Sequence, residues 1–197
     1  MIPGNCITVF CPDCGGGKDL LQLISGNTFG SVQWSDTKQV APMLPRLSPV
    51  QKCPACGHYY FLSSAKAVDG DDASSETGWL TFEEAVEAFG MLGDSNSDKL
   101  ELLALIVVWA FNDIYRNGDV PTTEQAAVFK DLMSGILKQQ VFTGNIILKA
   151  EFLRETGKFG ECIDLLEKHT PENEFLAGIK DKIIKKARAH DDMVFSI

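Results

Sequence analysis

Two copies of one pentapeptide constrain the fold of this chain more than any other feature. Residues 11–15 read Cys-Pro-Asp-Cys-Gly, and residues 53–57 read Cys-Pro-Ala-Cys-Gly. Two residues between the thiols let both sulfurs of one turn point at a single ion about 2.3 Å away. Two such turns, called knuckles below, complete a tetrahedron and leave no position open for substrate. The pattern predicts a structural metal site whose ligands are Cys11, Cys14, Cys53 and Cys56.

The metal expected in this site is zinc. Tetrahedral sulfur suits either zinc or iron, and rubredoxins hold iron between two similar knuckles for electron transfer. An aromatic residue usually follows the first rubredoxin knuckle, whereas Gly16, Gly17 and Lys18 follow it in this chain. A rubredoxin-like iron electron carrier is therefore kept as the alternative to a zinc protein.

The interval between the knuckles is long. Thirty-eight residues separate Cys14 from Cys53, against roughly 15–20 in the common zinc ribbon. We expect an added β-hairpin and the proline-rich residues 42–49 to fill this interval. The strand signals of this first part lie at 7–10, 28–34, 39–41 and 58–62. Cys6 and Cys162 remain outside the tetrad and are expected to be small packing residues.

The second part of the chain has the pattern of helices. Residues 69–78 are acidic, small and polar, which predicts a linker. After it, Thr81 with Glu84 and Thr122 with Gln125 have the spacing of capping boxes at two helix starts. Further helices are expected near 145–155 and 159–168, and a last one from Thr170-Pro171.

The helices near 145–168 resemble a tetratricopeptide repeat. Ala150 and Cys162 are small residues where two helices would touch, and an aromatic residue, Phe159, follows the turn at Gly157. The predicted fold class is α+β in two parts. A small, rubredoxin-like β zinc ribbon (1–68) and an acidic linker (69–78) precede an all-α, tetratricopeptide-like domain (79–197).

Three motifs in the first part support a resemblance to a family. Residues 25–30 read SGNTFG, residues 34–36 read WSD and residues 41–45 read APMLP. Together with the knuckles, over residues 11–62, they resemble a group of uncharacterised bacterial CPxCG zinc-ribbon proteins with a helical tail. The resemblance implies no activity. From the residues themselves, we expect Phe29 and Trp34 to pack over the metal site, and we consider Phe29, Trp34 and Asp36 as a partner surface.

Charge argues against a nucleic-acid partner. The first 66 residues carry five basic and three acidic residues, whereas the rest carry 13 basic and 24 acidic residues. Four thiolates with one Zn²⁺ would bring the first part close to neutral, so neither part offers the basic surface that binds phosphates. A nucleic-acid-associated zinc ribbon is therefore only a further alternative.

The remaining observations concern activity and location. No arrangement of catalytic residues is evident, so an enzyme is not expected. The longest apolar run, residues 102–111, has ten residues, fewer than the roughly 18 of a membrane span. No secretory signal is recognised at the N-terminus, so the expected location is the cytoplasm. The leading interpretation is a zinc-binding protein-interaction or scaffold module whose partner is another protein.

Overall fold

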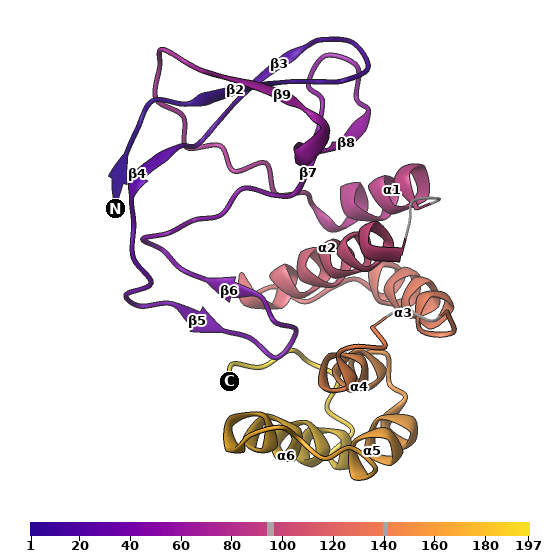
Figure 1. Ribbon diagram of the computed structural model, residues 1–197. Coiled ribbons are helices and arrows are strands. Elements are labelled where there is room, and N and C mark those ends of the chain that lie inside the picture. The colour runs from indigo at the N-terminus through magenta and orange to yellow at the C-terminus, as the bar shows by residue number, and fades with distance from the viewer. Residues whose placement is uncertain (94–96, 140–141) are drawn as a thin grey trace. The chain divides into compact units, whose positions relative to one another are not determined.

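The chain is a mixed α+β protein in which short antiparallel strands precede the helices (Figure 1). The computed structural model describes residues 1–93, 97–139 and 142–197. The strands are β1 (Ile2–Pro3), β2 (Ile7–Phe10), β3 (Gly17–Leu20), β4 (Leu23–Ser25), β5 (Val32–Gln33), β6 (Gln39–Val40), β7 (Val50–Lys52), β8 (Tyr59–Phe61) and β9 (Lys66–Asp69).

Two hairpins carry the knuckles. Strands β2 and β3 pair antiparallel, with Ile7 opposite Leu20 and Phe10 opposite Gly17, and the first knuckle is their loop. Strands β7 and β8 pair in the same way around the second knuckle. On its other edge β2 pairs with β9, which gives a sheet with the order β3-β2-β9. Strand β9 was not expected from the sequence.

The acidic segment after β9 is held against the sheet, unlike the linker that its composition predicts. The backbone N–H of Cys6 donates to the carbonyl of Asp72 at 2.6 Å, and that of Leu21 donates to Glu76 at 2.7 Å. The N–H of Gly70 returns a bond to the carbonyl of Cys6 at 2.9 Å. Small polar side chains cannot build a core, but their backbone groups pair as well as any others.

The helices begin where the capping chemistry predicts. Both capping boxes are present, at Thr81 with Glu84 and at Thr122 with Gln125. The last helix starts later than expected, because the side chain of Asn173 accepts from the N–H of Leu176 at 2.9 Å. The helices are α1 (Phe82–Leu92), α2 (Ser97–Arg116), α3 (Thr123–Leu137), α4 (Ile146–Glu155), α5 (Phe159–Glu167) and α6 (Glu174–Arg188). Among the described residues, none of them has the length and apolarity to cross a membrane.

The chain divides into two compact units. The β unit comprises Met1–Val32 and Val40–Ser95, and the helical unit comprises Gln33–Gln39 and Asn96–Ile197. This division differs from the expected boundary at residue 79, since α1 belongs to the β unit. The reason is a pair of contacts to the second hairpin: Lys52 bonds Glu84 at 3.0 Å, and the Tyr59 hydroxyl donates to Glu87 at 2.7 Å.

Helices α4, α5 and α6 pack together in the helical unit (Figure 1). Helices α4 and α5 form a hairpin that turns at Gly157, whose φ of 79° suits glycine. Cys162, Leu166 and Ile183 are completely buried among these helices. The burial of Cys162 agrees with a small packing residue, and the tetratricopeptide assignment stays a prediction.

A buried carboxyl group without its own cation lies in the helical unit. Glu155 accepts from Asn112 at 3.1 Å through one oxygen, and its other oxygen has no hydrogen-bond partner among the described residues. A guanidinium nitrogen of Arg154 lies 3.8 Å from this second oxygen, but the guanidinium donates to the Glu151 carboxylate at 2.7 Å. Burial raises the pKa of Glu155 well above its usual value near 4.5, and the charges of Glu151 and Asp36 raise it further.

Glu155→Gln tests whether this carboxyl is protonated in the folded chain. A raised pKa means that folding binds a proton, so the wild type loses unfolding free energy as pH rises from about 4.5 towards the folded-state pKa. The loss is at most ~1.4 kcal/mol per pH unit. Urea unfolding, followed by helical circular dichroism between about pH 6 and pH 8, should give a flatter slope for the variant.

The matched control is Asp131→Asn, which makes the same chemical change at an exposed position of α3. We expect this control to keep the wild-type slope. Equal slopes for Glu155→Gln and the wild type would contradict a protonated Glu155.

Candidate metal centre

The two knuckles have the same local structure. The N–H of Gly15 donates to the carbonyl of Cys11, and the N–H of Gly57 donates to that of Cys53, both at 2.9 Å. The N–H of Cys11 also donates to the carbonyl of Gly16 at 2.9 Å, and that of Cys53 donates to the carbonyl of His58 at 2.8 Å. Gly15 and Gly57 have φ angles of 73° and 76°, which a side chain would oppose. The repeated pentapeptide therefore encodes a repeated turn.

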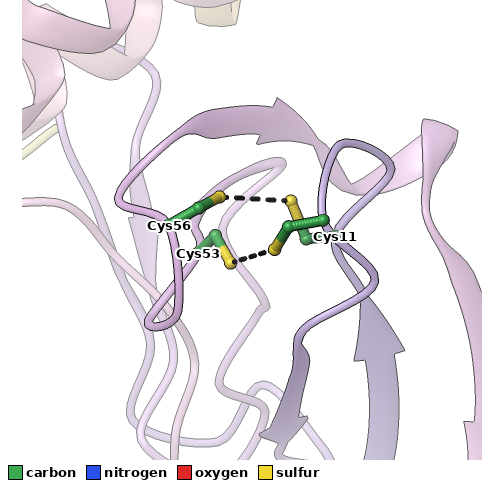
Figure 2. Close-up of side chains that lie close together, drawn as sticks. Cys11, Cys53 and Cys56 are labelled. Carbon is green, nitrogen blue, oxygen red and sulfur yellow. Dashed lines mark hydrogen bonds between the residues drawn. The ribbon is translucent and has the colours of Figure 1, made fainter.

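The two turns bring four sulfur atoms together. The sulfurs of Cys11, Cys14, Cys53 and Cys56 all lie within 4.8 Å of one another. Those of Cys11 and Cys56 are 3.8 Å apart, and those of Cys14 and Cys53 are 3.6 Å apart (Figure 2). Four sulfurs about 2.3 Å from one ion in a regular tetrahedron would be about 3.8 Å apart. The four cysteines thus cluster closely enough to bind a metal ion.

The four thiols do not ionise equally. Burial opposes ionisation of Cys53, yet the backbone N–H groups of Cys56 and Ala55 donate to its sulfur and help lower its pKa to about 6. The N–H of His58 lowers the pKa of Cys56, but burial and the bonds with neighbouring thiols such as Cys14 raise it to about 12. Once one sulfur is negative, a second negative sulfur at this distance is costly. A divalent cation bound here would remove that cost and displace the remaining protons.

Tyr60 packs against the cluster from the second hairpin. Its ring is buried with Cys11 and Cys53, and Ala65 packs beside them. Burial and the nearby sulfur charges raise the pKa of the Tyr60 hydroxyl to about 12, so it stays neutral. The sequence places Tyr60 on a strand, but nothing in the cysteine motif marks it as a neighbour of the metal site.

A cavity of about 420 Å³ adjoins the second knuckle, and Lys18 and Lys52 line it together with Cys53. The ammonium group of Lys18 donates to Gln51 at 3.2 Å, and that of Lys52 bonds Glu84 at 3.0 Å. Glu76 and Glu84 also line this cavity, so its two basic side chains are matched by two acidic ones.

Phe29, Trp34 and Asp36 do not form one surface. Phe29 is 84% exposed, so it does not pack over the metal site as expected; Tyr60 does. Trp34 is half-buried and belongs to the helical unit. Asp36 is completely buried in that unit, which corrects its expected place on a partner surface. Of the three, Phe29 alone presents most of its side chain to solvent.

The SGNTFG and APMLP motifs meet each other. A Cβ at Gly26 would lie 2.5 Å from the carbonyl oxygen of Met43 and 2.8 Å from the side chain of Leu44. The N–H of Asn27 donates to the same Met43 carbonyl at 3.3 Å, and the Asn27 side chain accepts from the N–H of Phe29 at 2.9 Å. These motifs therefore close the base of the insertion between the knuckles, and glycine is required where they touch.

Comparison with known proteins gives no relative from which to infer a role. No family model matches the chain, and no curated protein or solved structure is significantly similar to it. Function has to be inferred from the site itself.

Gly16→Ala tests how closely the knuckles must approach. A Cβ at Gly16 would lie 2.8 Å from the Cβ of Ala55 in the other knuckle, closer than such atoms come. Overpacking of this kind costs about 1–3 kcal/mol, so metal affinity should fall about 5- to 150-fold. Competition with a chromophoric chelator measures the affinity.

Removing the opposing methyl group provides the control. Ala55→Gly in the Gly16→Ala background should restore most of the lost affinity, because the 2.8 Å contact disappears. If the double variant binds metal as weakly as Gly16→Ala alone, the contact between the knuckles is not the cause.

Proposed function

We propose that Cys11, Cys14, Cys53 and Cys56 bind one zinc ion whose role is structural. The observation that carries this proposal is the sulfur spacing of 3.6 and 3.8 Å, which fits a tetrahedron around one ion. All four positions are taken by cysteine, so the ion has no site for substrate or water. Zinc is preferred because the residues after the first knuckle lack the aromatic of rubredoxins.

We further propose that the chain serves as a protein-interaction or scaffold module. Phe29 supports this role, because it lies in the turn before Gly30 and is 84% exposed. The side chain of Asn27 accepts from the N–H of Phe29 at 2.9 Å, and Gly30 has a φ of 71°. Both features define the turn. We take this ring as the anchor of the proposed interface, because a defined turn holds a large apolar side chain in solvent.

Metal analysis of the purified chain tests the first proposal. The wild type should carry one zinc per chain, and Cys53→Ser should lose it together with the β-unit fold, since a serine hydroxyl is a poor zinc ligand. Mass spectrometry under non-denaturing conditions gives the stoichiometry. Cys6→Ala is the matched control, because Cys6 is buried in the same unit but lies outside the cluster. A coloured protein carrying iron would favour the rubredoxin-like alternative, and a metal-free protein would refute both.

Phe29→Ser tests the second proposal. The wild-type chain should retain one or more specific proteins from a native lysate, and the variant should lose them, because removal of an interface anchor costs about 2 kcal/mol or more. Phe175→Ser is the matched control, since Phe175 is 66% exposed on α6. Equal losses with both variants, or with neither, would contradict a specific role for Phe29.

A further inference from the structure

A seven-residue turn from between the knuckles belongs to the helical unit. Residues Gln33–Gln39, called the docking turn below, group with α2–α6 although both flanking segments belong to the β unit. The turn holds its own shape: the N–H of Trp34 bonds the carbonyl of Lys38, and that of Thr37 bonds the carbonyl of Trp34, both at 2.9 Å. The side chain of Asp36 also accepts from the N–H of Lys38 at 3.1 Å.

The centre of the docking turn is bound by one face of α2. The carboxylate of Asp36 accepts from Asn112 at 3.0 Å and from the guanidinium of Arg116, and its carbonyl accepts from the indole N–H of Trp109 at 2.9 Å. The same guanidinium lies 5.0 Å from the centre of the Trp34 ring. Three successive turns of one helix thus recognise a single aspartate.

The edges of the docking turn are also held. The ammonium group of Lys38 pairs with Asp113 of α2. The N–H of Ser35 donates to the carbonyl of Phe195 at 2.9 Å, and that of Phe195 donates to the Ser35 hydroxyl at 3.2 Å. Opposite charges therefore face each other across this contact at two places, Asp36 with Arg116 and Lys38 with Asp113.

The contact has the composition of a separable interface. Apart from the half-buried Trp34 ring, the groups in contact are charged side chains, the Asn112 amide, the Trp109 indole N–H and backbone N–H groups. Water can bond these polar groups when the turn leaves. The core of the helical unit is different, since Phe129, Leu166 and Ile183 are completely buried apolar residues. Undocking the turn would therefore expose polar groups and leave this apolar core in place.

The second knuckle lies in the chain that connects the turn to α2. Residues 40–95 form that connection, and they include Cys53 and Cys56. When the metal holds the β unit folded, most of this connection has one conformation. When the β unit loosens, docking must also close a long flexible loop, which lowers the effective concentration of the turn at α2 roughly tenfold.

We propose that docking of Gln33–Gln39 on α2 is thermodynamically linked to metal binding at the four cysteines, so that the helical unit responds to metal occupancy. This inference rests on the proposed metal centre. Linkage is reciprocal: the factor by which zinc favours docking equals the factor by which docking favours zinc.

Tryptophan fluorescence measures docking in the full chain. In a Trp79→Phe background the remaining tryptophans are Trp34 and Trp109, and both lie at the docking contact. Removal of zinc with a chelator should shift their emission to longer wavelength and increase quenching by acrylamide. Addition of zinc should reverse both changes.

The reciprocal measurement uses variants outside the two knuckles. Asp36→Asn removes the charge that Arg116 binds, and it should lower zinc affinity several-fold while keeping one zinc per chain. Asp131→Asn, an exposed change on α3, should leave zinc affinity unchanged. If Asp36→Asn does not fold, Lys38→Gln removes only the pair with Asp113 and should give a smaller loss in the same direction.

Two results would overturn the inference, and they are distinguishable. Stoichiometric zinc binding with no change in Trp34 and Trp109 emission, or with wild-type affinity in Asp36→Asn, would reject the linkage and keep the metal centre. A chain that binds no metal at all would reject the proposed metal centre and the linkage with it.

Discussion

Mutual repulsion among four sulfur atoms is the constraint on which the β unit depends. The sulfurs lie within 4.8 Å of one another, and at this distance one negative sulfur opposes the ionisation of the next. The strands that present them are only two to four residues long, so ladder bonds and apolar burial contribute little. The proposed central cation would turn the repulsion into attraction and would supply stability that so small a core lacks.

The helical unit is stabilised differently, because it buries charged side chains in pairs. Asp36, Glu151 and Arg154 are completely buried, and each has an oppositely charged partner within the unit. Breaking one such pair leaves an unpaired buried charge, which typically lowers the free energy of unfolding by ~3–5 kcal/mol. Glu155 shares the nearest cation with Glu151, and its burial raises its pKa, which favours the neutral form. These pairs specify one position for the turn that carries Asp36.

The sequence predicted structures that depend on neighbouring residues, but it did not predict contacts between residues far apart in the chain. The knuckles and the capping boxes at Thr81 and Thr122 depend on residues within a few positions of one another, and the structure confirms them. The partners of Asp36 lie 76 and 80 residues away, so nothing near it in the sequence indicates that it is buried. Tyr60 and β9 escaped for the same reason, since only pairing across the sheet and the second hairpin gives them their place.

The unusual length of the interval between the knuckles follows from these contacts. A common ribbon needs only roughly 15–20 residues there, whereas this chain has 38. The contact of Gly26 with Met43 closes the base of the added segment, so its two ends leave and return close together. The seven residues Gln33–Gln39 lie between these contacts, and they are the part that joins the helical unit. A shorter interval could still close the tetrahedron of cysteines, but it would have no turn with which to reach α2. The extra residues therefore serve the helical unit, although the sequence places them inside the metal-binding motif.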